Sequence, residues 1–297
     1  MWIPVVGNSL GNFNLNKKII IFGASGLIGN EIYSFLIKKN KFEVIGTSKK
    51  DNLNFRNLNL KSIESLETAK NLIIDFKPNF VINSLGITKH NADINQEGLT
   101  FLVNSIFPHF LALNSEKLNY KLIHISTDCV FDGKKNKPYM DDEIANARDI
   151  YGYSKSLGEI KDLDNVITIR TSVIGHKKED KSGLLEWFLD QEGNCDGYSN
   201  AIFSGLSTIQ LSREVFKIIQ NKNFISGLFN LSNNAIDKLT LLETIAKIYK
   251  KNIKISDNSN IKVNRALNSM KYSKLFSFKK EKWEEIVYEL YKSISKE

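Results

Sequence analysis

The fold is decided by the stretch Lys17-Lys18-Ile19-Ile20-Ile21-Phe22-Gly23-Ala24-Ser25-Gly26-Leu27-Ile28-Gly29. A run of β-branched residues followed by three glycines and an amphipathic segment predicts a strand, a tight turn and a helix. Glycines let the backbone approach a pyrophosphate, and the amides at a helix N-terminus attract its negative charge. Because this turn follows a strand and opens a helix, the stretch predicts a dinucleotide site.

Apolar strand-like runs alternate with helical patterns along the chain that follows. We expect strands at 42–46, 80–84, 122–126 and 166–170, and helices at 63–76, 99–118 and 151–161. This alternation predicts a parallel sheet covered on both faces, the Rossmann-type doubly wound α/β fold. Beyond Gly175 the pattern loosens, with helices expected at 183–190, 211–220 and 240–250, extended segments at 203–209 and 227–231, and a loop at 256–260.

Tyr151-Gly-Tyr-Ser-Lys155 places a phenol and an ammonium four residues apart, on one face of the expected helix. The ammonium favours the phenolate, so we expect the pKa of Tyr151 to fall below its usual value of about 10. The same spacing also occurs on ordinary helix surfaces. The functional interpretation therefore depends on what else the fold brings to this helix.

A second polar group follows the expected strand at 122–126, where the chain reads Ser126-Thr127-Asp128. Catalytic side chains gather at the carboxyl ends of parallel strands, and the chain between Thr127 and Tyr151 is long enough to bring the helix back beside this strand end. Alone, such a triplet is typical of a turn or a helix cap. Together with the glycine turn and the Tyr–Lys pair, it predicts a catalytic site.

These motifs resemble the extended short-chain dehydrogenase/reductases, and within them the dTDP-4-dehydrorhamnose reductase group. The resemblance continues past the Tyr–Lys helix, and the segments that carry it are Gly23–Gly29, Ser126–Gly133, Tyr151–Glu159, Ile169–Gly175, Gly205–Thr208 and Asn264–Ser269. It implies a dinucleotide-binding domain over residues 1–175, with 1–16 as an N-terminal extension, and mainly a substrate-binding domain over 176–297. It also implies that a segment at about 209–232 returns to the sheet.

The resemblance implies NADPH-dependent reduction of a nucleotide-linked 4-keto-6-deoxy sugar, in nucleotide-sugar biosynthesis for surface polysaccharide such as dTDP-rhamnose. Hydride transfer to a ketone needs an acid for the oxygen, and Tyr151 is that acid. Lys155 lowers its pKa and holds the nicotinamide ribose, while Thr127 hydrogen-bonds the substrate oxygen. The expected substrate residues are Asp128, Cys129, Thr208 and Arg265.

The cofactor prediction depends on the end of the second strand, which reads Thr47-Ser48-Lys49-Lys50. Enzymes that prefer NAD place an acidic residue there, whereas a hydroxyl and two cations suit the extra phosphate of NADP, so NADP(H) is favoured over NAD(H). Asn59 stands where the family commonly has an Asp near the adenine. The expected cofactor-binding residues are Gly23, Ser25, Gly26, Leu27, Ile28, Gly29, Ser48, Lys49, Asn59, Leu60, Asn83, Ser84, Leu85, Tyr151 and Lys155.

Three alternatives to the reductase differ in how much the sequence says about them. A 4,6-dehydratase carries an Asp-Glu pair, and Asp128 is followed by Cys129, which argues against dehydration. A nucleotide-sugar 4-epimerase uses the same Tyr and Lys with retained NAD, and a regulatory subunit resembling that of methionine adenosyltransferase binds NADP without turnover, so both stay open. Cys129 replaces the usual Tyr of the rhamnose-type reductases, which leaves the sugar and its nucleotide, dTDP or UDP, undecided.

Composition constrains the partners. The formal net charge is +8, yet the lysines are scattered through the chain instead of gathered in a stripe with aromatics, so we expect no nucleic-acid partner. The chain has 2 Cys and 4 His without metal-ligand spacing, and no run is long enough for a membrane span. We expect a cytoplasmic enzyme without metal or membrane, and a homodimer is left open.

Overall fold

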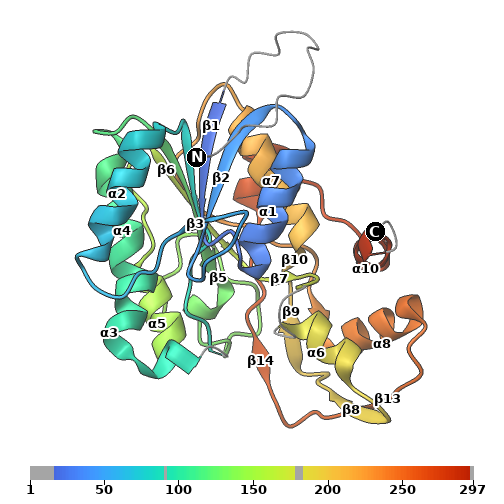
Figure 1. Cartoon of the computed structure of the whole chain (residues 1–297). Helices are drawn as coiled ribbons and strands as arrows, with labels where there is room; N and C mark the ends of the chain where they lie inside the picture. The colour runs from blue at the N-terminus through green and yellow to red at the C-terminus, as the bar shows by residue number, and fades with distance from the viewer. Residues whose placement is uncertain (1–16, 90–91, 178–182, 295–297) are drawn as a thin grey trace, which may run out of the picture.

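A seven-stranded parallel sheet forms the centre of the molecule (Figure 1). The computed structural model describes residues 17–89, 92–177 and 183–294. The strand order is β11-β6-β5-β4-β1-β2-β3. The strands are β1 (Lys17–Phe22), β2 (Phe42–Ser48), β3 (Arg56–Asn57), β4 (Phe80–Asn83), β5 (Lys121–Thr127), β6 (Val166–Thr171) and β11 (Gly227–Asn230). The predicted Rossmann-type α/β fold is confirmed.

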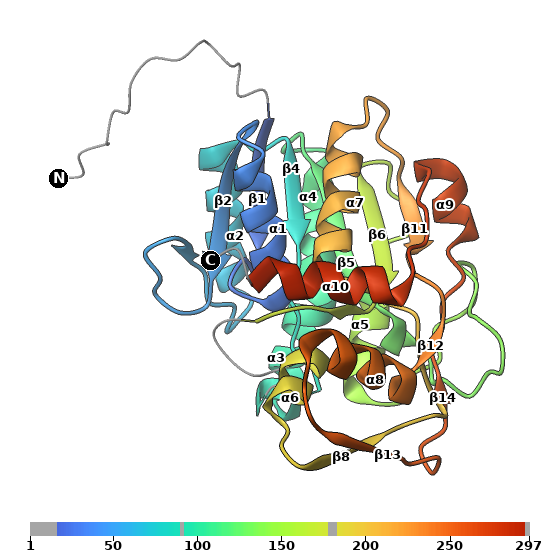
Figure 2. The same cartoon turned by 90° about the vertical axis from the view of Figure 1, so that its right-hand side faces the viewer.

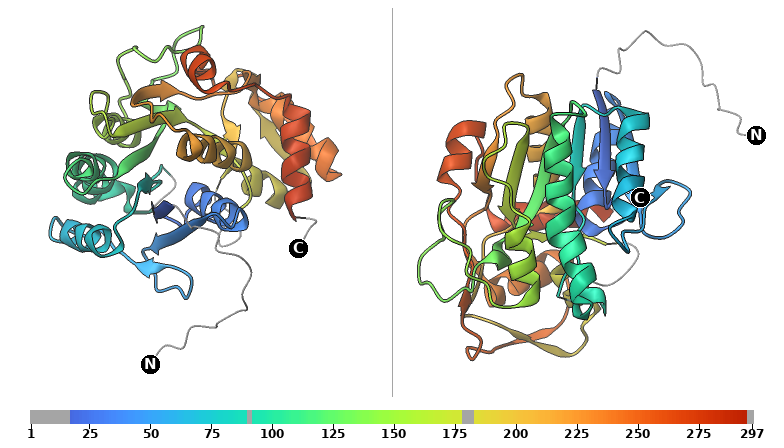
Figure 3. Two further views of the ribbon diagram at one scale, coloured as in Figure 1. Left: turned by 90° about the horizontal axis from the view of Figure 1, so that it is seen from above. Right: turned by 90° about the vertical axis from the view of Figure 1, so that its left-hand side faces the viewer.

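Helices cover both faces of this sheet, as Figure 3 shows from above. On one face lie α1 (Leu27–Lys38) and α7 (Thr208–Gln220), and on the other lie α2 (Ser65–Phe76), α4 (Phe107–Ser115) and α5 (Ile150–Leu157). Strand β1 shows why the sequence folds this way. Ile19 and Ile21 pack with the residues of α1 and α7, while Ile20 and Phe22 pack with those of α2 and α4. A strand buried on both faces reads as a continuous apolar run.

The helix expected at 99–118 is interrupted. The chain forms a 3-10 turn at Ala92–Asn95, then α3 (Glu97–Phe101), a π-helical turn at Leu102–Ile106 and finally α4. The π turn carries the buried Asn104, whose side-chain amide bonds the backbone N–H and C=O of Ile87 and the hydroxyl of Ser154. The prediction of one continuous helix was wrong because this amide replaces regular helical spacing with tertiary bonds.

Smaller sheets with α6 (Leu184–Asp190) and α8 (Lys238–Tyr249) lie below the main sheet in Figure 2, and α10 (Trp283–Ile294) crosses in front of that sheet. Strand β8 (Asn194–Gly197) pairs with β13 (Lys254–Asp257), and β9 (Ala201–Phe203) lies between β12 (Ile236–Asp237) and β14 (Val263–Asn264). The three helices share a core that contains Leu185, Ile245 and Ile286.

Two sequence expectations fail in this region. The segment expected to be extended over 203–209 divides into the end of β9 and β10 (Leu206–Ser207), and α7 begins at Thr208 because Ser207 and Gln210 form a capping box. The loop expected at 256–260 is a strand as far as Asp257, since β13 pairs with β8. Strand β10 itself pairs with β7 (Val173–Ile174).

The chain returns to the main sheet after α7. Strand β11 pairs in parallel with β6, with Gly227 opposite Ile167 and Asn230 opposite Arg170. Helix α9 (Met270–Phe276) follows later and contacts β11. The domain boundary at 175 stays a prediction, and the expected N-terminal extension at 1–16 lies outside the described residues. Within the part that is described, no helix combines the length and apolarity that a membrane span requires.

Candidate active site

The glycine turn joins β1 to α1, and its glycine positions leave little or no room for a Cβ. Gly23 has a φ of +84°, which favours glycine, and a Cβ at Gly29 would lie 2.2 Å from the carbonyl oxygen of Gly23. Thr47 on β2, which we did not predict as a site residue, supports the turn: its hydroxyl accepts from the Gly23 N–H at 3.2 Å, and its carbonyl accepts from Ala24 N–H at 2.9 Å. Helix α1 is therefore held directly against the strand end.

The residues around this turn fit the pyrophosphate of a dinucleotide. The N-cap of α1 is Gly26, no side chain caps the helix, and its first turn holds no acidic residue, so its amides can meet an anion. Ser25, Leu27 and Ile28 are partly exposed there. Ser84 Oγ donates to the carbonyl of Phe22 at 2.7 Å and would lie 2.6 Å from a Cβ at Gly29.

The remaining predicted cofactor residues lie at two places. Leu85 packs against Gly23, and Asn83 is fully buried, with its amide 3.2 Å from His124 Nδ1 and its oxygen accepting from Leu85 N–H.

Ser48 ends β2 and is buried, whereas Lys49 is exposed and its Nζ lies 2.7 Å from Asp93 Oδ2. The backbone joins this end to Asn59 and Leu60, because the N–H of Leu58 donates to Ser48 O at 2.8 Å.

Thr127 and Tyr151 come together because α5 packs on the turn that follows β5. Thr127 caps the 3-10 turn η3 (Asp128–Val130), and its hydroxyl accepts from the Cys129 N–H at 3.1 Å. A Cβ at Gly152 would lie 2.1 Å from the carbonyl oxygen of Cys129, so only a glycine lets the first turn of α5 approach so closely. Asp149 caps α5 by accepting from the Gly152 N–H at 3.0 Å.

The electrostatics differ from the sequence expectation. Burial raises the pKa of the Tyr151 phenol above its usual range, while side-chain hydrogen bonding with Thr127 acts in the opposite direction. Lys155 is 3% exposed, and its Nζ donates to the carbonyl oxygen of Ile125 at 2.8 Å. Burial lowers the pKa of Lys155 to about 8. The expected lowering of the Tyr151 pKa was therefore wrong for this structure, because burial of the phenol raises it.

Two of the four predicted substrate residues, Asp128 and Cys129, follow Thr127 directly and act on the pKa of Tyr151. Arg265 lies close enough to act on the pKa of both of them. Burial raises the pKa of Asp128, although the cation of Arg265 acts against that rise. Burial and the neighbouring Asp128 raise the pKa of the Cys129 thiol to about 12. Arg265 Nε donates to Phe131 O at 2.7 Å. Thr208 lies elsewhere, since it is 2% exposed at the start of α7 and its hydroxyl faces Gly175.

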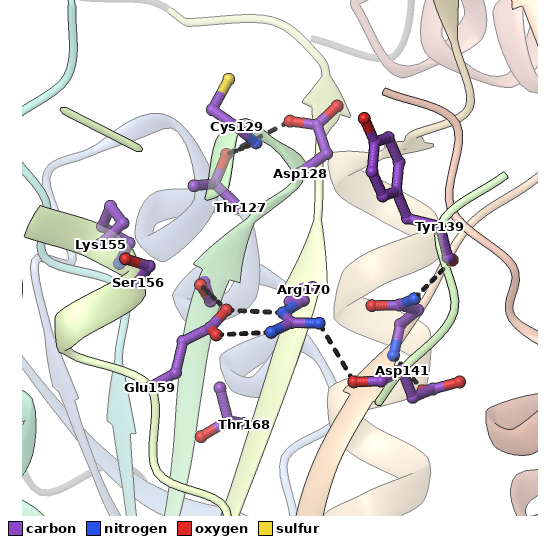
Figure 4. Close-up of polar contacts among 12 residues, drawn as sticks. Thr127, Asp128, Cys129, Tyr139, Asp141, Lys155, Ser156, Glu159, Thr168 and Arg170 are labelled. Atoms are coloured by element: carbon purple, nitrogen blue, oxygen red, sulfur yellow. Dashed lines mark hydrogen bonds and ion pairs between the residues drawn. The ribbon is translucent and has the colours of Figure 1, made fainter. Parts of the chain in front are cut away.

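Sequence reasoning missed two ionic contacts at the site. Lys89, after β4, places its Nζ 3.0 Å from Asp149 Oδ2 and thus pairs with the cap of α5. The buried Arg170 on β6 makes two bonds of 2.8 Å to Glu159, and Ser126 Oγ donates to the same carboxylate at 2.8 Å (Figure 4). An Asp immediately before a helix is a readable capping signal, but nothing in the sequence pairs Glu159 with Arg170.

The comparisons with known proteins agree on one family. The family model of the RmlD substrate binding domain matches residues 17–295. Spore coat polysaccharide biosynthesis protein SpsK of Bacillus subtilis is 29% identical over 224 residues, 74% of each chain. A dTDP-4-dehydrorhamnose reductase of Aggregatibacter actinomycetemcomitans is 30% identical over 48% of this chain, and methionine adenosyltransferase 2 subunit beta of Xenopus tropicalis is 31% identical over 55%.

These last two alignments cover 45% and 47% of the relatives' own lengths. Among solved structures, dTDP-4-dehydrorhamnose reductase of Bacillus anthracis in complex with NADP superposes with a TM-score of 0.80 at 20% identity, covering 94% of this chain and 99% of that one. Similarity at this level shows the fold. The similarity extends across both the main sheet and the smaller part of the molecule.

Proposed function

Because the chain belongs to the RmlD substrate binding domain family, among the extended short-chain dehydrogenase/reductases, we propose that it uses NADPH to reduce the ketone of a nucleotide-linked 4-keto-6-deoxy sugar. One observation carries the proposal. Helix α5 packs on η3 so closely that the Tyr151 phenol lies beside Thr127, while Lys155 Nζ bonds the backbone oxygen of Ile125 on the same strand. The glycine turn follows β1 at the same carboxyl end of the sheet. Catalytic groups and a dinucleotide site that lie together at the carboxyl ends of the strands suit a reductase.

Three residues of the chain have separate roles in the proposed reaction. When bound, NADPH supplies a hydride to the carbonyl carbon. Tyr151 donates the proton that the developing alkoxide needs, and its raised pKa keeps the phenol protonated at neutral pH. The Thr127 hydroxyl donates to Asp128 Oδ1 at 3.3 Å, and it would turn this donor to the substrate oxygen when the sugar binds. Lys155 places a buried cation one helical turn from Tyr151, where it favours negative charge developing on the phenol oxygen.

The substrate's diphosphate has cations nearby. Arg265 lies close enough to Asp128 and Cys129 to act on both of their pKa values, and Lys89 acts on that of Cys129. A guanidinium binds phosphate oxygens in a bidentate manner. Cys129 brings a small, neutral side chain to this edge of the site, since its thiol stays protonated at neutral pH. We assign sugar selectivity to this position.

A regulatory role is the second candidate, because methionine adenosyltransferase 2 subunit beta matches this chain as well as a reductase does. The two functions differ in turnover. We expect purified protein to oxidise NADPH, followed at 340 nm, when given nucleotide-linked 4-keto-6-deoxy sugars with dTDP or UDP. Tight NADPH binding without oxidation by any sugar of this panel would reject the reductase and favour the regulatory subunit. Epimerisation without net NADPH consumption would favour the 4-epimerase.

The cofactor preference has its own experiment. We propose that Ser48 and Lys49 bind the 2′-phosphate of NADPH, which requires Lys49 to exchange its contact with Asp93 for the phosphate. Fluorescence titration should give a lower Kd for NADPH than for NADH. The Lys49→Ala variant should lose about tenfold in NADPH affinity, the effect of one exposed charge-assisted bond, and keep its NADH affinity. Equal losses for both cofactors would contradict this assignment.

A further inference from the structure

The ion pair of Glu159 and Arg170 lies between β5, β6 and the end of α5 (Figure 4). The side chains are 2% and 0% exposed, and two bonds of 2.8 Å join Arg170 Nε and Nη2 to the two oxygens of Glu159. A buried ion pair stabilises a fold no better than well-packed apolar side chains do, because both charges lose their water. Its directional bonds, in contrast, hold neighbouring elements in one arrangement.

On one side the pair connects the catalytic strand to the catalytic helix. Ser126 Oγ donates to Glu159 Oε1 at 2.8 Å, and Ser126 immediately precedes Thr127. Glu159 directly follows Gly158, the C-cap of α5, and stands four residues after Lys155 in the chain. A single carboxylate thus bonds to the end of β5 and to β6, while its own backbone follows the C-cap of α5.

On the other side the pair reaches the substrate residues. Arg170 Nη1 donates to the carbonyl oxygen of Asp141 at 3.1 Å, and its guanidinium lies 4.9 Å from the centre of the Phe131 ring. That ring stacks on Tyr139 at 4.0 Å, and the backbone oxygen of Phe131 accepts the bond from Arg265. The arginine therefore supports the segment that orients Arg265.

We propose that Glu159 and Arg170 are positioning residues, which hold the Thr127 hydroxyl in hydrogen-bonding register with the Tyr151 phenol. The reaction they serve is the reduction proposed above. Both side chains are buried, and their hydrogen bonds run to each other, to Ser126 and to the backbone of Asp141. Glu159 also acts on the pKa of Lys155 through its charge. The pair acts through Ser126 and through the end of α5, and a displacement of about 1 Å at the phenol is enough to cost on the order of 10²-fold in rate.

The decisive variant replaces both charges together. Glu159→Leu with Arg170→Met removes the ion pair and leaves no unpaired buried charge, so the protein should keep a Tm close to that of the wild type. We expect kcat to fall roughly 10- to 100-fold while the Kd for NADPH stays within about twofold. A stable double variant with wild-type kcat would overturn the proposal. If the double variant does not fold, Ser126→Ala decides, because it keeps the ion pair and removes only its bond to the strand.

For Ser126→Ala we expect a wild-type Tm and a kcat lowered about tenfold, and an unchanged kcat would again reject the positioning role. The matched control is Glu289→Gln. Arg213 bonds Glu289 in the same bidentate way, at 2.9 Å and 2.9 Å, but this pair joins α7 to α10 and its side chains are each 35% exposed. Loss of that pair should leave kcat at the wild-type value.

A readout independent of turnover separates this proposal from the proposed function. In a crystal structure of the folded variant, the separation of Tyr151 Oη and Thr127 Oγ1 should exceed that of the wild type by at least about 0.5 Å. An unchanged separation would reject the positioning role even if kcat fell. If the wild type reduces no sugar of the panel, the reductase proposal fails, while this distance still tests what Glu159 and Arg170 do.

Discussion

At the scale of single residues, the proposed acid Tyr151 is tested by removing its hydroxyl. The Tyr151→Phe variant keeps the ring that packs on η3 and removes only the acid, so hydride transfer should fall by roughly 10² to 10⁴-fold. NADPH affinity should be unchanged because the glycine turn is untouched. Single-turnover kinetics with fluorescence titration would measure both quantities. A variant that reduces the best substrate at the wild-type rate would show that another group supplies the proton.

The buried Lys155 makes the free energy of unfolding depend on pH, and a comparison with the Lys155→Met variant isolates its contribution. Burial lowers the pKa of its folded form to about 8, from a usual value of 10.5. The cost of burying the cation is therefore fully present below about pH 8 and disappears as the pH rises towards 10.5. Over that interval the unfolding free energy of the wild type should rise relative to that of Lys155→Met by on the order of 3 kcal/mol.

Urea unfolding of the two proteins between pH 8 and 10.5 provides the measurement. Only the difference between them is interpreted, because other lysines and tyrosines titrate in the same interval and contribute equally to both. A difference that does not change with pH would mean that the Lys155 ammonium is better solvated than its position against Ile125 O indicates.

At the scale of elements, the approach of α1 to β1 depends on a single missing methyl group. In Gly29→Ala the new Cβ would lie 2.2 Å from the backbone oxygen of Gly23, so α1 must move. We expect a loss of about 1–3 kcal/mol in stability, as for other overpacked sites, and at least a tenfold loss of NADPH affinity. Gly98→Ala is the control. Gly98 lies exposed in α3, where a Cβ would meet no atom within 4 Å outside its own helix, so this variant should gain about 0.5–1 kcal/mol in stability.

The elements also show what the sequence can predict. Strands such as β1 and β5 are readable because burial on both faces demands a continuous apolar run, and the glycine turn is readable because few other functions need three glycines there. The π turn at Leu102–Ile106 and strand β13 are not readable. Each depends on a partner that is distant in the sequence, Ile87 for Asn104 and β8 for β13. The local sequence does not indicate either partner.

The residues proposed as catalytic divide in the same way. Tyr151, Lys155 and Thr127 were predicted because their chemistry needs particular side chains at particular spacings. The pKa of Tyr151 was predicted in the wrong direction, since burial depends on how α5 packs on η3 and not on the four-residue spacing. The bond between Glu159 and Arg170 was missed because it joins a helix end to a strand that follows it.

At the scale of the whole molecule, NADPH should stabilise the fold by mass action. At a concentration 100-fold above its Kd, a ligand that binds only the folded state adds about 2.7 kcal/mol, which for a chain of this size raises Tm by about 5 °C. NADH at the same concentration should raise it less. Scanning fluorimetry would measure the shifts. Gly29→Ala should show a smaller rise with NADPH, and an unchanged Tm in the wild type would mean that the glycine turn does not bind it.

The position of β11 in the main sheet affects how the protein folds while it is synthesised on the ribosome. The sheet cannot gain its last strand, nor α1 its neighbour α7, until the chain has passed through β7, β8, β9 and β10. Until then Ile19, Ile21 and Ile123 present an apolar face that α7 has not yet covered. Such surfaces promote aggregation during synthesis, and pairing between distant segments is slow. The nascent chain should therefore need chaperone protection until residues 208–230 have emerged.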